Sequence, residues 1–299
     1  MAAISPDIFR QVKRIELRTR GLVNSRFVGE YHSVFKGQGM EFSEVREYQP
    51  GDEVRAIDWN VSARMRRLFV KRYVEERELT VLLIVDCSGS SRFGTGDRDK
   101  QAMAAELAAV LALTATRNND RVGLIICSDR PEHVVPPRKG RRHALRLVRD
   151  VLAWPTSHRP TDLGAALNYA ARVLSHHALV FVISDFVTPS IERQLRVVGQ
   201  RHDLVAVVLD DPGERTLPDL GVSRLVDAES GQLIEIDTSD PAVRENYDAT
   251  VRAERDARRT LLRRLAIDEV VVRTESGWAE PLLRFFNTRE IRGRRIRRR

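Results

Sequence analysis

The feature that most constrains this chain is an apolar run that ends in a carboxylate and two hydroxyls. Residues 80–91 read Thr-Val-Leu-Leu-Ile-Val-Asp-Cys-Ser-Gly-Ser-Ser. A β-branched run of this length without polar alternation is typical of a strand buried on both faces of a parallel sheet. Open α/β sheets bind ligands at the carboxyl ends of such strands, so the residues after Val85 are expected at a ligand-binding edge.

The loop after this run carries oxygen ligands at alternate positions. These are Asp86, Ser88 and Ser90. Side chains spaced in this way can turn inward around one small cation. A carboxylate with two hydroxyls favours magnesium, manganese or calcium over zinc, because those cations prefer oxygen. The same residue types also cap helices and make turns after strands, so a purely structural role stays open.

The spacing resembles D-x-S-x-S, the metal-ion-dependent adhesion site of von Willebrand factor type A domains. That family completes its site with a Thr and an Asp from two later loops. Thr161, in a loop that opens a predicted helix, and Asp185, at the end of a second buried run, stand in the corresponding order. The resemblance therefore implies a metal site made of Asp86, Ser88, Ser90, Thr161 and Asp185. Ser91 and Asp162 are expected to be local caps.

The composition indicates a globular protein. Of the 299 residues, 42% are hydrophobic and 31% charged, which suits one large domain or two modest ones. No apolar run approaches the ~20 residues that cross a bilayer, and the charged N-terminus lacks a signal-peptide core. The two cysteines, Cys87 and Cys127, make no disulfide framework and are expected to be reduced. These features predict a cytoplasmic protein.

The positive charge is concentrated at the C-terminus. The net charge is +8, and residues 292–299 alone hold six arginines. With almost no apolar residue to bury, the tail 291–299 is expected to be disordered. Binding of nucleic acid or anionic lipid is the alternative, but no aromatic residues are interleaved with the basic ones.

Alternating helix and strand patterns begin at Thr80. They predict an α/β fold for residues 80–290, a doubly wound, mostly parallel sheet with helices on both faces. Two segments lack this alternation of helix and strand patterns. Residues 21–73 show turn signals with short apolar pieces, and residues 223–237 show the pattern of a hairpin. We expect the N-terminal segment 1–79 to be β-rich and to pack with the hairpin 223–237.

A second signature lies within residues 37–59. It has the pattern G-x-G-x-E-F … R-x-Y-x-x-G-D-x-x-R-x-I-D-W. This is similar to the bacterial "domain of unknown function 58" family, in its short form without transmembrane helices ahead of the signature. The resemblance covers about residues 37–286. It implies a von Willebrand A-like domain after the signature and a MoxR-type AAA+ ATPase as partner, but no reaction.

The polar residues of this signature have two interpretations. Asp52, Arg55, Asp58 and Arg64 are predicted to form a salt-bridged scaffold around the turn that begins at Pro50. The alternative is a docking surface for a partner. The glycines at 37 and 39 do not make a dinucleotide fingerprint, because the third glycine and the strand–helix context are missing.

Two classes of function remain. The leading hypothesis is a non-enzymatic protein-protein interaction module, whose cation binds an acidic side chain of the partner. The alternative is a metal-dependent hydrolase with Asp86 on magnesium and Ser88 or Cys87 as nucleophile. A nucleophile needs an adjacent base, and no histidine spacing pairs with Ser88, although His158 stands near Thr161. The chain also lacks G-x-S-x-G and the P-loop motif, so we expect neither a hydrolase nor an ATPase.

Overall fold

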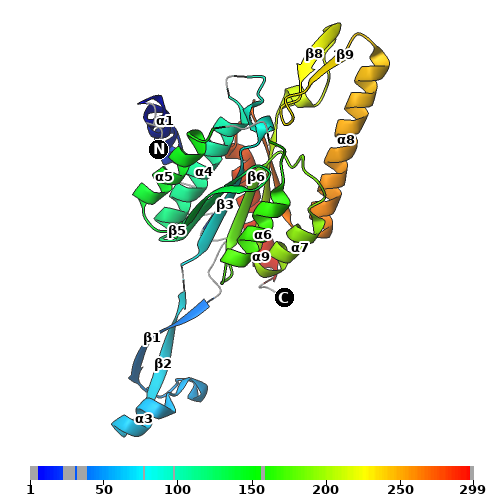
Figure 1. Ribbon diagram of the computed structural model, residues 1–299. Coiled ribbons are helices and arrows are strands. Elements are labelled where there is room, and N and C mark those ends of the chain that lie inside the picture. The colour runs from blue at the N-terminus through cyan, green and yellow to red at the C-terminus, as the bar shows by residue number, and fades with distance from the viewer. Residues whose placement is uncertain are drawn as a thin grey trace. The chain divides into compact units, whose positions relative to one another are not determined.

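The computed structural model describes residues 6–22, 31, 39–76, 78–96, 98–155 and 159–296. Their contacts divide the chain into two units. One unit joins Met1–Val34 to Thr80–Arg299, and the other is Phe35–Leu79. Figure 1 traces the elements of both units along the chain.

The large unit is built on a six-stranded sheet. Its strands are β3 (Thr80–Asp86), β4 (Arg121–Cys127), β5 (Pro131–Arg138), β6 (Leu179–Ser184), β7 (Asp203–Asp210) and β10 (Asp268–Arg273). They lie in the order β10-β7-β6-β3-β4-β5. All neighbours are parallel except β4 and β5, which are antiparallel. The predicted doubly wound, mostly parallel sheet is confirmed, and its strand order reverses between β3 and β6.

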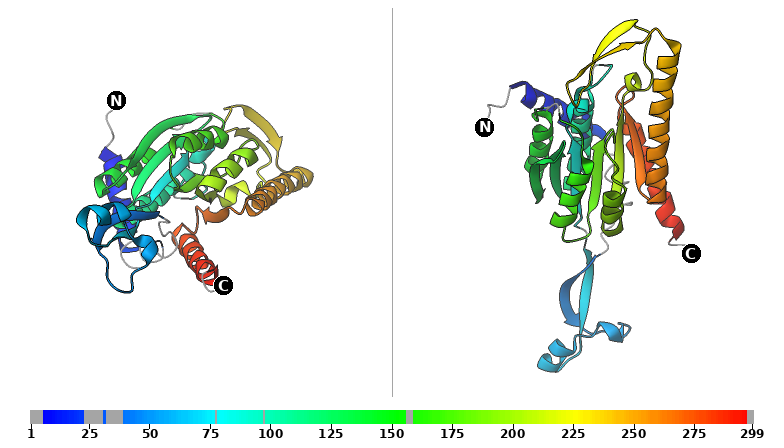
Figure 2. Two further views of the ribbon diagram at one scale, coloured as in Figure 1. Left: turned by 90° about the horizontal axis from the view of Figure 1, so that it is seen from below. Right: turned by 45° about the vertical axis from the view of Figure 1, so that its right-hand side comes forward.

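Helices lie on both sides of this sheet (Figures 1 and 2). They are α4 (Lys100–Arg117), α5 (Arg141–Leu152), α6 (Leu163–Val173), α7 (Glu192–Arg201), α8 (Pro241–Arg264) and α9 (Ala279–Ile296). Alternate residues of β3 and β6, such as Leu82 and Val180, join a core with Leu167 of α6 and Leu195 of α7. The α4 helix is buried along most of its length, as its Ala- and Leu-rich sequence requires.

Both ends of the chain differ from the expectation. Helix α1 (Pro6–Leu22) contacts α4 and α5, so the segment 1–79 is not one β-rich piece. At the other end, α9 continues to Ile296, so the prediction of a disordered tail is wrong for residues 291–296. Arginine is a good helix former and extends a helix that Leu282 and Phe286 anchor in the core. Residues 297–299 lie outside the described part.

The predicted hairpin is confirmed as β8 (Val222–Val226) paired antiparallel with β9 (Leu233–Asp237). The residues of both strands are exposed or half-buried. By its contacts the hairpin belongs to the large unit. Its packing against the N-terminal segment stays a prediction.

The small unit pairs β1 (Gly39–Glu47) antiparallel with β2 (Phe69–Glu76). The connection holds a short 3-10 turn, η2 (Val54–Ala56), and helix α3 (Trp59–Met65).

Two aspartates of the signature stabilise this connection. The Arg46 guanidinium donates to both oxygens of Asp52, at 2.8 and 2.6 Å. Asp58 caps α3 and lies 3.5 Å from the Lys71 ammonium. The scaffold role is thus observed, but with Arg46 and Lys71 as partners in place of the predicted Arg55 and Arg64. The first two signature residues, 37 and 38, lie outside the described part.

Candidate metal centre

Two carboxylates emerge side by side where the strand order reverses. Asp86 is the last residue of β3, and Asp185 directly follows β6. The two strands pair in parallel, with Val85 opposite Ile183. Both carboxylates are nearly buried, with Asp86 4% and Asp185 7% exposed. The predicted metal residues therefore begin at the position where open α/β sheets bind ligands.

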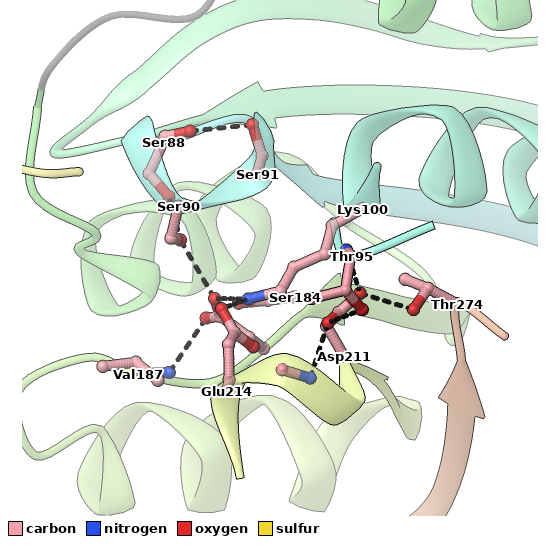
Figure 3. Close-up of polar contacts among 12 residues, drawn as sticks. Ser88, Ser90, Ser91, Thr95, Lys100, Ser184, Val187, Asp211, Glu214 and Thr274 are labelled. Atoms are coloured by element: carbon pink, nitrogen blue, oxygen red, sulfur yellow. Dashed lines mark hydrogen bonds and ion pairs between the residues drawn. The ribbon is translucent and has the colours of Figure 1, made fainter. Parts of the chain in front are cut away.

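A run of hydrogen bonds joins four of the five predicted ligands. The Ser88 amide donates to Asp86 Oδ1 at 3.0 Å. The hydroxyls of Ser88 and Ser90 are 3.2 Å apart. Ser90 donates to Asp185 Oδ2 at 2.9 Å (Figure 3). The loop is a 3-10 turn, η3 (Gly89–Arg92), in which Ser91 Oγ bonds the Ser88 carbonyl. The local role predicted for Ser91 agrees with this contact.

Thr161, the fifth predicted ligand, lies at the same edge of the sheet, but in the loop before α6 and not directly after a strand. Its loop is tied to the D-x-S-x-S loop by the Gly89 amide, which donates to the Arg159 carbonyl at 3.5 Å. Thr161 is 2% exposed, and its hydroxyl donates to Glu229 Oε1 at 3.0 Å. The next residue, Asp162, caps α6 as predicted.

Lys100 is a site residue that sequence reasoning missed. It is the first residue of α4, and its side chain is 2% exposed. Its ammonium donates to Asp185 Oδ2 at 2.8 Å and to Glu214 Oε1 at 2.5 Å (Figure 3). Nothing in the sequence separates this lysine from a solvated one at a helix start.

Glu229 is the other missed residue. It lies in the turn between β8 and β9, 68 residues after Thr161 in the chain. The turn was predicted, but its position against the sheet depends on the tertiary fold.

Burial and like charge set the protonation of the two central carboxylates. Burial and the charge of Asp185 raise the pKa of Asp86 to about 6, although hydrogen bonds from Ser184 and Ser88 oppose the rise. Burial also acts to raise the pKa of Asp185, but the Lys100 ammonium outweighs it and holds that pKa below its usual value. Burial raises the pKa of Glu229 and of Glu214. A bound cation would stabilise the ionised forms of Asp86, Glu214 and Glu229, whose pKa values are raised.

The donor set fits a hard divalent cation. Three hydroxyls and two carboxylates supply oxygen alone, which suits magnesium, manganese or calcium. Lys100 adds a constraint, because its ammonium already bonds one oxygen of Asp185. A cation here would share that carboxylate with Lys100.

Cys87 and two of the histidines, the groups that a hydrolase could use as nucleophile or base, are buried or bonded to other residues. Cys87 is fully buried, and burial with the Asp86 charge raises the pKa of its thiol well above the usual value. His133 pairs with Asp150 at 3.2 Å, and His143 contacts the Val122 carbonyl at 2.8 Å. His158 lies outside the described residues.

The strand order, the antiparallel edge strand and the D-x-S-x-S loop define a von Willebrand factor A-like α/β domain. The chain belongs to the family described as "Protein of unknown function DUF58", whose family model matches residues 44–257.

Bacterial relatives align with most of this chain or with part of it. Rv1480 of Mycobacterium tuberculosis (strain ATCC 25618 / H37Rv), an "Uncharacterized protein", is 32% identical over 288 residues, covering 95% of this chain and 90% of that protein. The "Uncharacterized protein YeaD" of Bacillus subtilis (strain 168) is 28% identical over 105 residues, covering 35% of this chain and 24% of that protein.

Two solved structures show a distant likeness to this chain. The "conserved hypothetical protein BatB" of Bacteroides thetaiotaomicron aligns with a TM-score of 0.48 and 14% identity, covering 71% of this chain and 98% of that one. A "von Willebrand factor type A" protein of Catenulispora acidiphila gives a TM-score of 0.33 and 14% identity, covering 48% and 35%. The assignment of the fold rests on the topology above. Among the described helices, none has the length and apolar character needed to span a membrane.

Proposed function

We propose that this chain is a non-enzymatic, metal-dependent protein-protein interaction module that binds a MoxR-type AAA+ ATPase in the cytoplasm. The observation that carries the proposal is the hydrogen-bonded run from Asp86 through Ser88 and Ser90 to Asp185, at the point where the strand order reverses. The identity of the partner rests on the family resemblance of the N-terminal signature.

Each residue has a distinct part in this proposal. Ser88, Ser90 and Thr161 offer neutral hydroxyls, while Asp86 and Asp185 offer charge directly or through water. Magnesium, or manganese or calcium, supplies an electrophilic point that binds a carboxylate of the partner. Because three of the five ligands are neutral, they leave much of the positive charge available to that carboxylate.

The alternative is a metal-dependent hydrolase using Asp86 and Ser88. A serine nucleophile needs a base within hydrogen-bonding distance. Ser88 Oγ lies 3.2 Å from Ser90 Oγ, and the carboxylate that the Ser88 side chain bonds is Asp86, which the hydrolase would need as the metal ligand. His133 and His143 make contacts elsewhere. These contacts favour the interaction module over the hydrolase.

Co-purification with a MoxR-type ATPase of the same organism tests the proposal. Magnesium should support the complex, and chelator should weaken it. Asp86→Ala should act as chelator does, because it removes one of the proposed metal ligands. Glu275→Ala is the matched control, since it removes an exposed carboxylate that follows β10 and should change nothing. Undiminished association in chelator and in Asp86→Ala would refute the metal-bridged complex.

A further inference from the structure

Glu229 lies on the candidate metal centre, although it comes from an element outside the sheet. Its carboxylate accepts the hydroxyl hydrogen of Thr161 at 3.0 Å. It is also close enough to Asp185 for the charge of that residue to contribute to the raised pKa of Glu229. A carboxylate here has the chemistry expected of a partner's acidic side chain, but it belongs to the same chain.

The turn that carries Glu229 has a fixed conformation. Asp227 Oδ1 accepts from the Glu229 amide at 3.0 Å, and Asp227 Oδ2 accepts from Ser230 Oγ at 2.5 Å. The Gly231 amide bonds the Asp227 carbonyl at 2.8 Å, and Gly231 has φ +69°, a conformation that favours glycine. These bonds hold the turn in one conformation, and this conformation positions Glu229 at the site.

The same turn is seated on the D-x-S-x-S loop. A Cβ added at Gly89 would lie 1.9 Å from the Ala228 carbonyl oxygen. Only glycine permits this approach at position 89. The glycine in the middle of the metal loop thus serves the contact with the turn.

The strands behind the turn have few other attachments to the sheet. Every residue of β8 and β9 is exposed or half-buried. At the base, Thr238 Oγ1 bonds the Gly221 carbonyl at 2.8 Å, a contact between the two ends of the hairpin itself. Arg244 of α8 holds the same base by donating to the Thr238 and Ser239 carbonyls, at 2.5 and 2.9 Å. Within the described residues, the hairpin is thus attached to α8 at its base and to the site at its turn.

We propose that Glu229 is a sixth residue of the metal centre, a carboxylate of the chain itself that takes the coordination position otherwise open to the acidic side chain of a partner. This inference rests on the proposed function. With a cation bound, Glu229 closes the site. A partner then binds by replacing Glu229, and the β8–β9 hairpin moves away from the D-x-S-x-S loop.

Calorimetric titration with manganese chloride tests the assignment. Glu229→Gln keeps an oxygen that can accept from Thr161 but loses the charge, so the fold should persist. We expect its manganese affinity to fall about tenfold or more, the effect typical of removing a group that supports a metal site. Glu235→Gln is the matched control, because it removes an exposed carboxylate of the same hairpin that pairs with Arg224. Its affinity should equal that of the wild type.

Hydrogen exchange gives a second measurement. Manganese should slow amide exchange at residues 227–231 more in the wild type than in Glu229→Gln, because the carboxylate would bind the cation directly, whereas the contact with Gly89 is the same in both proteins. The assignment of Glu229 would be overturned by an unchanged manganese affinity in Glu229→Gln, or by amide exchange rates at residues 227–231 that manganese does not change. The proposed function would still stand in that case if manganese binding depended on Asp86. A wild type that binds no manganese, or binds it equally in Asp86→Ala, would overturn both.

Discussion

Lys100 and Asp185 form a buried ion pair at the centre of the site. The ammonium nitrogen is 2.8 Å from Asp185 Oδ2, and the two side chains are 2% and 7% exposed. Lys100 is the first residue of α4, and Asp185 directly follows β6, so the pair links a helix on one face of the sheet to the carboxyl edge of the sheet. A buried pair of this kind contributes little net stability, but removal of one partner leaves an uncompensated charge.

Lys100→Met should therefore destabilise the protein strongly when no divalent cation is present. We expect a loss of about 3–5 kcal/mol in the free energy of unfolding, measured by urea titration in chelator. Magnesium should then raise the melting temperature of the variant more than that of the wild type, because the cation replaces the lost charge beside Asp185.

Arg284→Met is the control for this prediction. Arg284 pairs with Glu280, and both side chains are largely exposed, so its loss should cost at most about 1 kcal/mol. A cost for Lys100→Met as small as that of the control would contradict the role assigned to the buried pair.

Gly89→Ala should separate the hairpin turn from the metal loop. The added Cβ has no space against the Ala228 carbonyl, and the loosely attached hairpin is the part that can move. We expect faster amide exchange at residues 227–231 and a loss of about 1–3 kcal/mol in stability, the usual cost of overpacking. Gly96→Ala is the matched control, since nothing lies within 4 Å of the added carbon. Equal exchange in both variants would show that the turn tolerates the contact.

The sheet could be predicted from the sequence because its strands are continuous apolar runs. Val81 to Val85 and Val180 to Ile183 are almost fully buried, as their lack of polar alternation indicates. The order of Asp86 and Asp185 along the chain, with parallel pairing of their strands, placed both carboxylates at one edge. The local sequence pattern was sufficient to predict these strands, because a strand buried on both faces appears in the sequence as a continuous apolar run.

The remaining site residues could not be predicted because their position depends on packing between distant elements. Lys100 becomes buried only when α4 lies on the sheet beside Asp185 and Glu214. Glu229 reaches Thr161 only because the β8–β9 turn lies on Gly89. Charged side chains in a helix start or a turn have the composition of solvated ones, so the sequence alone cannot single them out.

Truncation after Glu290 should leave the fold stable. The core contacts of α9 come from Leu282 and Phe286, and Arg289 pairs with Asp203 and Asp268, all before the cut. Ile291, the next residue, is 55% exposed. The melting temperature should stay within about 2–4 °C of the full chain, which corresponds to no more than about 1 kcal/mol. Truncation after Arg284 removes Phe286 and should cost about 3–5 kcal/mol. A similar loss from both truncations would show that residues 291–299 contribute to the core.

His202 gives the protein a pH-dependent stability that can be isolated by one substitution. The residue is 4% exposed, and neither ring nitrogen has a hydrogen-bond partner among the described residues. Burial lowers its pKa from 6.5, and the charge of Arg201 and the neighbouring His177 act in the same direction. The folded state therefore binds fewer protons than the unfolded state below pH 6.5. Stability from this residue is fully present above pH 6.5 and is lost as the pH falls toward the lowered value.

His202→Leu should remove this dependence, because a buried imidazole without partners is replaced by an apolar side chain of similar size. We expect the wild type to lose up to about 1.4 kcal/mol relative to the variant between pH 7.5 and pH 5.5, measured by urea unfolding at both values. Comparing the two proteins cancels the titration of the groups that do not interact with His202, including Asp86. His176→Leu, which changes an exposed imidazole before β6, should retain the wild-type dependence. A parallel loss in the wild type and in His202→Leu would show that His202 is protonated equally in the folded and unfolded states.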